Sequence, residues 1–215
     1  MSDRQTQKII TEDEIDILQE IMNIAFGKAS ADLADYIDIF IKLSVPDVRV
    51  ASASALPGYF REMVTGHDRV SIVEQKFWGK FSGHALLVFP AGADSELITI
   101  LTCEDPDIFC GEPIDELAKG TLMEVGNIVV GACIGKIAEI LNDVMSYSPP
   151  VVLLDRHATD IIPVDIFNPR DRAIILNAVF RFENRQVSGM LVLIFNQSSI
   201  VWLQKALKEF MEQYE

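Results

Sequence analysis

The chain repeats part of its own sequence, and this repeat limits the folds it can adopt. When the sequence is shifted by 104 positions, "ILQEIMNIAFGKAS" (17–30) lies over "TLMEVGNIVVGACI" (121–134). "SGHALLVF" (82–89) and "SGMLVLIF" (188–195) match at nearly the same offset. Residues 20–46 contain seven identities where unrelated sequences would give about two: Glu20/Glu124, Asn23/Asn127, Ile24/Ile128, Gly27/Gly131, Ala34/Ala138, Ser44/Ser148 and Pro46/Pro150. We therefore expect two similar units.

Each half is predicted to contain the same order of elements. Helical periodicity is followed by a turn with proline, by strands of alternating or apolar character and by a closing helix. Ser198 or Ser199 is the expected cap of the last helix. The predicted helices are about 12–41, 93–102, 114–145 and 198–213, and the predicted strands are 47–53, 69–80, 83–90, 151–154, 172–183 and 188–195. Segments 54–68 and 155–171 are expected to be irregular, and 103–113 is the expected connector.

These elements predict an α+β fold. Two α-β-β units that each expose an apolar sheet face should share one mainly antiparallel sheet and one core, related by a pseudo-twofold axis. The whole chain, 1–215, is then a single domain with a first repeat at about 11–102 and a second at about 114–213. Two long helices, one in each repeat, carry the candidate sites.

Composition excludes several classes of function. The formal net charge of −14 makes nucleic acid an unexpected partner, because binding it depends on Lys and Arg that neutralise phosphates. No apolar run approaches the roughly 20 residues that cross a bilayer, and the N-terminus is polar, so neither membrane insertion nor a signal peptide is expected. Cys103, Cys110 and Cys133 have no metal or disulfide spacing. The expected location is the cytoplasm.

A polar stripe runs along each long helix. At about 100° per residue, Asp16, Glu20, Asn23 and Gly27 fall within roughly 60–80° of one another. The second copy of the stripe consists of Gly120, Glu124, Asn127 and Gly131. Most other positions on both helices are apolar, so each helix is expected to be buried on most sides with one polar seam left open.

Two interpretations of the stripe compete. It can be the solvated side of an amphipathic helix, which needs no function. Asn and Gly are unfavourable in helix interiors, however, and Gly costs about 1 kcal/mol relative to Ala. Because both choices occur twice on the same face, we favour a site that another molecule approaches closely, with a carboxylate and an amide available to it.

The spacing Asp16-x3-Glu20-x2-Asn23-x22-Pro46 resembles the signature of the CheC/CheX/FliY phosphatases of chemotaxis. Glu124-x2-Asn127-x22-Pro150 repeats its later part. The resemblance covers essentially the whole chain, and the duplicated organisation is most similar to that of CheC-type members.

The resemblance implies a hydrolase of two-component signalling that removes phosphate from the aspartyl-phosphate of CheY-type response regulators. Glu20 and Glu124 would pair with a lysine of the regulator, while Asn23 and Asn127 would position the attacking water. Magnesium would belong to the regulator, and no cofactor of the chain's own is implied. Gly27 and Gly131 would admit the regulator's loops.

Several positions qualify this picture. Pro46 and Pro150 are expected to end the helical regions and set the turns rather than to touch substrate. Gly120 stands where the family usually has Asp or Ser, and Met22 stands where many members have Gly, as Gly126 does here. The two sites therefore need not be equally active.

Three alternatives stay open. The chain could be a non-catalytic module that binds response regulators. It could equally be a module that binds a CheD-type deamidase, as CheC proteins do. It could also be a scaffold whose duplicated helices pair with another subunit, in which case both stripes would be completely buried.

Overall fold

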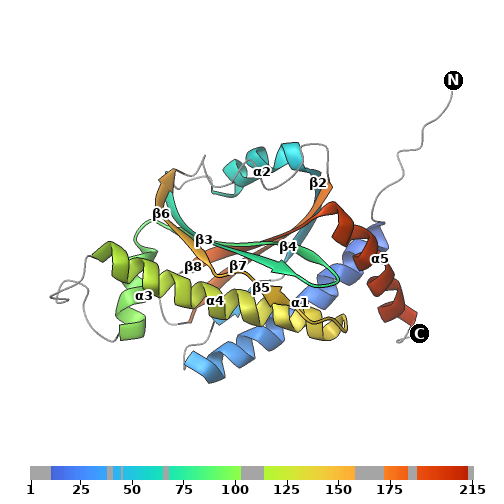
Figure 1. Ribbon diagram of the computed structural model, residues 1–215, viewed down its shortest axis with the longest axis horizontal. Helices are drawn as coiled ribbons and strands as arrows, with labels where there is room; N and C mark the ends of the chain where they lie inside the picture. The colour runs from blue at the N-terminus through green and yellow to red at the C-terminus, as the bar shows by residue number, and fades with distance from the viewer. Residues whose placement is uncertain are drawn as a thin grey trace.

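An eight-stranded antiparallel sheet forms the centre of the molecule, with helices on both of its faces (Figure 1). The computed structural model describes residues 11–37, 41–44, 46–64, 68–102, 114–157, 172–183 and 188–212. The helices are α1 Glu12–Ile37, α2 Leu56–Met63, α3 Ala93–Thr102, α4 Ile114–Ile140 and α5 Gln197–Glu212, with a 3₁₀ turn at Ala53–Ala55. The strands are β1 Ile41–Leu43, β2 Asp47–Ser52, β3 Arg69–Trp78, β4 Ser82–Pro90, β5 Ser146–Tyr147, β6 Val151–His157, β7 Arg172–Phe182 and β8 Ser188–Phe195.

The two halves of the chain exchange strands across the sheet. The order is β1-β7-β8-β4-β3-β5, with β2 also paired to β7 and β6 also paired to β3. Each half contributes one hairpin, β3–β4 or β7–β8, and the two hairpins meet where β4 pairs with β8. The short strands that follow each long helix pair with the hairpin of the other half. The predicted α+β class and shared antiparallel sheet are confirmed.

A separate hydrophobic core lies on each face of the sheet. On one face α1 and α4 lie side by side and pack against inward residues of β3, β4, β7 and β8, joined by α3 and α5. On the other face α2 alone among the described helices covers a smaller core, into which it inserts Leu56 and Phe60. The long helices are therefore fixed to a rigid platform along their buried sides.

The ends of the long helices have local causes. Thr11 and Glu14 form a capping box before α1, since the Thr11 hydroxyl accepts the Glu14 N–H and the Glu14 carboxylate accepts the Thr11 N–H. After α4, Asn142 adopts a positive φ of 52°, which stops the helix. Lys80 in the β3–β4 turn donates through its ammonium group to the Asn142 carbonyl.

Four details of the sequence prediction are wrong. The long helices end at Ile37 and Ile140 instead of near 41 and 145, and a short strand, β1 or β5, follows each one. Pro46 and Pro150 therefore do not end the helices, because they lie after these strands and immediately before β2 and β6. The segment 54–68, predicted to be irregular, contains α2. The cap of α5 is Asn196, whose Oδ1 accepts the Ser199 N–H.

Several predicted features lie outside the described residues. They are the connector 103–113 with Cys103 and Cys110, most of the irregular segment 155–171, and the β7–β8 turn. Cys133 is described, and it is a buried free thiol of α4.

Helix α4 has the length and apolar composition of a membrane-spanning helix over Asp115–Ile140. In this fold, 56% of its most apolar window is buried against the rest of the chain. The buried residues, among them Leu122, Val129 and Ile137, belong to the core between α4 and the sheet, which accounts for the helix's composition.

Candidate functional site: two exposed acid–amide pairs

The stripe of α1 faces solvent along its whole length. Asp16, Glu20, Asn23 and Gly27 are all exposed. Between them, Leu18, Ile21, Met22, Ala25 and Phe26 are buried in the core. The polar seam predicted from the sequence is therefore open, and the alternative of a completely buried stripe does not hold for the chain by itself.

The stripe of α4 is arranged in the same way. Gly120, Glu124 and Asn127 are exposed, and Gly131 is partly exposed. Leu122, Val125, Val129 and Val130 are buried on the opposite side. Among the residues that the structure describes, no hydrogen bond or ion pair joins the α1 pair to the α4 pair, so the helices carry two separate sites.

The glycines of the stripes border open space. A Cβ atom added to Gly27, Gly120 or Gly131 would meet no atom of the chain within 4 Å, apart from its own immediate helix. Nothing within the described fold therefore requires glycine at these positions. Their small size matters only to a molecule that approaches from outside.

Each stripe also has an apolar neighbour. Ile24 is 38% exposed beside Asn23, and Met123 is 42% exposed beside Glu124. Each pair thus combines a carboxylate, an amide and an apolar side chain on one rigid surface. This combination suits contact with a protein better than contact with a small ion.

The segments that follow the two long helices make the same pair of hydrogen bonds to the sheet. The Ser44 N–H donates to the Val179 carbonyl at 2.8 Å and its Oγ accepts the Val179 N–H at 2.9 Å. Ser148 makes the same two bonds to Lys76, each 3.0 Å long. The identity of Ser44 and Ser148 in the repeat thus has a structural reason that sequence reasoning did not supply.

The amides of the two pairs differ in their support. Asn127 Oδ1 accepts a hydrogen bond of 3.2 Å from Nε2 of Gln75, a buried residue of β3. At the first site the bond that is present is different: Gln19 Nε2 donates to the Pro46 carbonyl at 2.7 Å, which ties α1 to the start of β2. No such bond holds the Asn23 side chain among the described residues.

Gln19 and Gln75 are the residues that sequence reasoning missed. Gln75 had a weak signal, since it is a polar residue at an inward position of the apolar strand "RVSIVEQKFW". Gln19 lies next to Glu20 within the motif and carries no signal of its own. Pro46 immediately precedes β2, and its carbonyl accepts the hydrogen bond from Gln19, while Pro150 immediately precedes β6.

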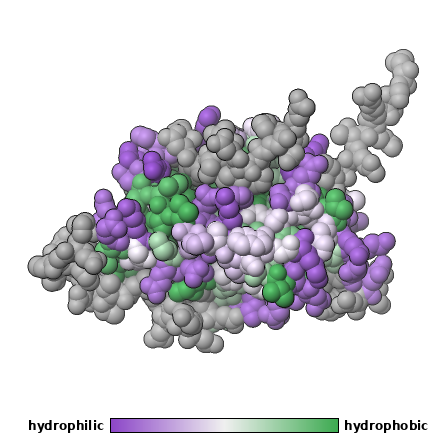
Figure 2. All heavy atoms as spheres, viewed as in Figure 1, coloured by the Kyte–Doolittle hydropathy of each residue, from purple (hydrophilic) through white to green (hydrophobic). Residues whose placement is uncertain are grey.

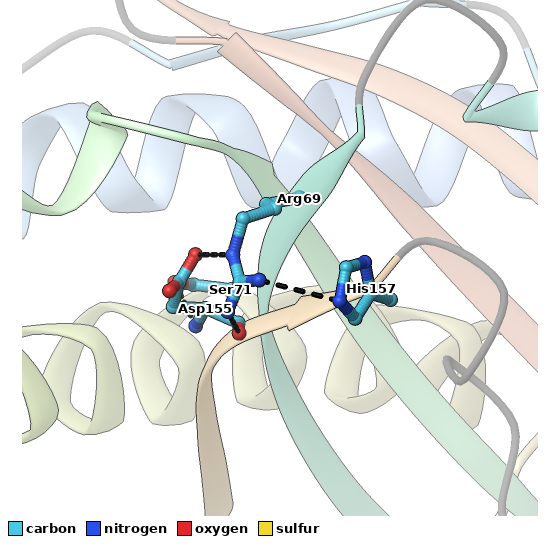
Figure 3. Close-up of polar contacts among 4 residues, drawn as sticks. All are labelled: Arg69, Ser71, Asp155 and His157. Atoms are coloured by element: carbon cyan, nitrogen blue, oxygen red, sulfur yellow. Dashed lines mark hydrogen bonds and ion pairs between the residues drawn. The ribbon is translucent and has the colours of Figure 1, made fainter.

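A second polar cluster joins β3 to β6 (Figure 3). Arg69 lies between Asp155 and His157, and it donates to the Asp155 carboxylate and carbonyl. The Ser71 hydroxyl accepts the Asp155 N–H at 3.3 Å, where the register of the two strands shifts and Asp155 has a positive φ of 49°. These bonds satisfy backbone groups at a β-bulge. Because no bond joins Ser71 to His157, the cluster does not form a Ser-His-Asp triad.

The best-defined cavities in the part of the chain that the structure describes are not lined by the acid–amide pairs. A cavity of about 250 Å³ lies between the end of α4 and α5, lined by Lys80, Leu141, Trp202 and Lys205, and it includes no stripe residue. No group of three or more His, Cys, Asp or Glu among the described residues could hold a metal ion. On the face shown in Figure 2, apolar side chains gather over β6.

Comparison with known proteins adds to this picture. A model of the CheC-like family matches residues 117–154, which include Glu124, Asn127 and Pro150. The chain is 27% identical over 150 residues to the CheY-P phosphatase CheC of Bacillus subtilis (strain 168), and the match covers 68% of each protein.

Solved structures share the fold. Thermotoga maritima FliY matches with a TM-score of 0.69 and 19% identity, over 94% of this chain and 98% of that one. The FliM–SpeE complex from H. pylori contains a match with a TM-score of 0.60 and 9% identity, over 93% and 97%. The CheX–CheY–BeF3–Mg²⁺ complex from Borrelia burgdorferi contains one with a TM-score of 0.53 and 19% identity, over 84% and 98%.

Proposed function

Because the chain belongs to the CheC/CheX/FliY family of chemotaxis proteins, we propose that it hydrolyses the aspartyl-phosphate of CheY-type response regulators. Its named relative in Bacillus subtilis is a CheY-P phosphatase. The observation that carries the proposal is the exposure of Glu20, Asn23, Glu124 and Asn127 on the open sides of two helices whose opposite sides are buried in the core.

The arrangement suits a substrate that is itself a folded protein. A phosphorylated regulator brings its own pocket, so the phosphatase needs side chains that protrude rather than a cavity. Helices fixed to a sheet hold such side chains more accurately than loops do. The open space at Gly27 and Gly131 would let the regulator's surface approach to the backbone of α1 or α4.

In the proposed reaction, Glu20 or Glu124 forms an ion pair with a lysine of the regulator and thereby fixes the docked orientation. Asn23 or Asn127 then enters the phosphorylated pocket and orients a water molecule in line with the phosphorus–oxygen bond. The water oxygen bonds to phosphorus while the bond to the aspartate oxygen breaks. Inorganic phosphate leaves as dihydrogen phosphate, with the oxygen and both protons of the water, and the aspartate carboxylate is restored.

Positioning is enough for this chemistry. Phosphoryl transfer relies mainly on alignment and charge stabilisation, and an amide can orient water without changing its protonation state. The Mg²⁺ that neutralises phosphoryl charge would be held by the regulator. The structurally similar CheX from Borrelia burgdorferi was solved in a complex that contains CheY, BeF3 and Mg²⁺, which supports this source of the metal ion.

The direct test is the decay of phosphorylated CheY-type regulators of the same organism. The proteins to compare are the wild type, Glu20→Ala/Asn23→Ala, Glu124→Ala/Asn127→Ala and the quadruple variant. Each double variant should lose part of the acceleration, and the quadruple variant should leave only the regulator's own decay. Lys205→Ala/Glu209→Ala, which removes an exposed ion pair of α5, is the matched control and should accelerate decay like the wild type.

Full acceleration by the quadruple variant would refute the catalytic assignment. Binding of the regulator without any acceleration by the wild type would instead support a docking module. Binding of a CheD-type protein in the same assay series would identify the second partner that the family resemblance implies.

A further inference from the structure

Gln75 lies beneath the second pair and is a buried polar residue in an apolar layer. Its residue surface is 2% exposed, and its inward-facing neighbours along β3, Val73 and Phe77, belong to the main core. Its Nε2 donates to the Ser148 carbonyl at 2.9 Å and to Asn127 Oδ1 at 3.2 Å. Burying an amide is unfavourable unless it forms such bonds, so this side chain needs a reason to be there.

These two bonds determine which way the Asn127 amide points. The Ser148 carbonyl can only accept a hydrogen bond, so the Gln75 atom that faces it must be the nitrogen. The second N–H of that nitrogen is directed at Asn127, so the Asn127 atom that receives it must be the oxygen. Oδ1 of Asn127 therefore points inward, and its Nδ2 donors point toward solvent.

We propose that Gln75 is a positioning residue for the second site, an inference that rests on the phosphatase function proposed above. It holds the Asn127 amide with Nδ2 facing the docked phosphoryl group, whose oxygens are acceptors that gain charge during transfer. A flipped amide would instead turn its oxygen, which can only accept hydrogen bonds, toward the phosphoryl oxygens.

The first site lacks this device. The two hairpins can be aligned because Phe77 pairs with Gly83 in the first and Phe180 pairs with Gly189 in the second. Gln75 lies two residues before Phe77, so the corresponding residue of β7 is Ala178, two residues before Phe180. Alanine has no hydrogen-bonding group with which to orient Asn23.

The packing of α4 against the sheet also differs from that of α1 at the corresponding position. A Cβ atom added to Gly126 would lie 2.5 Å from Val73 Cγ1, so glycine is what allows α4 to lie this close to β3. At the corresponding position of α1, the fully buried Met22 occupies the space between helix and sheet. Gln75 can reach Asn127 because of this close contact, and its role is confined to the second pair.

The test uses the full chain with Glu20→Ala/Asn23→Ala, in which the second pair alone remains. Gln75→Met keeps the length of the side chain and removes its donors. We expect kcat for dephosphorylation to fall about tenfold or more, since misplacing a reacting group has effects of that size. KM should stay unchanged, because Glu124 and the docking surface are intact. The side-chain amide of Asn127 should become more mobile in ¹⁵N relaxation measurements.

Ser71→Ala is the matched control. Ser71 is also a buried polar residue of β3, and its hydroxyl accepts the Asp155 N–H of β6, but no hydrogen bond joins it to Asn127. This variant should keep the parent kcat and the parent mobility of the Asn127 amide.

The outcomes separate the two proposals. No acceleration by the parent chain and by the wild type would overturn the proposed function, and the positioning role with it. Acceleration by the parent with an unchanged kcat in Gln75→Met would overturn the positioning role alone. An equal fall of kcat in Ser71→Ala, or a rise of KM without a change in kcat, would also overturn it.

Discussion

At the scale of single residues, glycine serves two opposite purposes on the long helices. Gly126 faces inward and lets α4 lie against Val73, whereas Gly27 faces open space. Glycine is a poor helix former in both places. Inside the fold its cost is offset by close packing, and outside the fold only an external partner can offset it.

This difference predicts opposite effects of the same substitution. Gly27→Ala should raise the free energy of unfolding by about 1 kcal/mol, because alanine favours the helix and meets nothing. Gly126→Ala should lower it by roughly 1–3 kcal/mol, because the new methyl group overlaps Val73. Urea denaturation followed by circular dichroism would measure both values.

A larger substitution at Gly27 tests whether the regulator approaches α1 at this position. In a chain with Glu124→Ala/Asn127→Ala, Gly27→Leu should remain folded but should dephosphorylate the regulator more slowly, because leucine fills the approach to Asn23. Unchanged activity in this variant would mean that the regulator does not contact α1 at Gly27.

The sequence was informative about the site residues that repeat and uninformative about those that do not. Glu20, Asn23, Glu124 and Asn127 stood out because unfavourable helix residues recur at one spacing. Gln75 could not be recognised in this way, because its hydrogen bond to Asn127 exists only when α4 packs against β3 in the folded protein. Gly126 matches a feature of the family, but its packing against Val73 depends on the same tertiary contact.

At the scale of elements, α2 is the only described helix on its face of the sheet. It is eight residues long and contains Pro57 and Gly58, so local preference alone does not predict it. Tertiary packing stabilises it, since Phe60 is buried against the outer face of the sheet and contacts Tyr59 edge-on. By contrast, β8 and α3 agree with their predicted limits because their apolar patterns are strong and their ends carry turn residues.

Phe60→Ala should destabilise the protein by about 3–5 kcal/mol through the cavity that it leaves. The fraction that remains folded should keep the wild-type kcat, because α2 and the pairs lie on opposite faces of the sheet. Thermal unfolding together with dephosphorylation assays at low temperature would check both statements. A fall of kcat in fully folded Phe60→Ala would show that the outer face is coupled to the sites.

At the scale of the whole molecule, the exchange of strands makes each half depend on the other. β2 completes the sheet beside β7, and β6 completes it beside β3. Sequence similarity between the halves predicted a shared sheet. It could not predict the exchange, because pairing β2 with its own hairpin would satisfy the same hydrophobic pattern.

The two tryptophans can test this dependence, since Trp78 belongs to the first half and Trp202 to the second. We predict that Trp78→Phe and Trp202→Phe, each with one fluorescent reporter left, show single denaturation transitions that coincide with the circular dichroism transition of the same variant. Cooperative unfolding of one domain gives such coincidence. Tryptophan fluorescence of one half that changes well before the circular dichroism signal would indicate two independent units.

A crystal structure of the chain bound to a CheY-type regulator carrying beryllofluoride and Mg²⁺ would test most directly whether the two acid–amide pairs act on the phosphorylated pocket. We expect α1 or α4 to cover the regulator's phosphorylation pocket. Asn23 or Asn127 should lie within hydrogen-bonding distance of the beryllofluoride or its adjacent water, and Glu20 or Glu124 should pair with a lysine. A complex in which the regulator binds elsewhere and both acid–amide pairs remain in solvent would contradict this expectation.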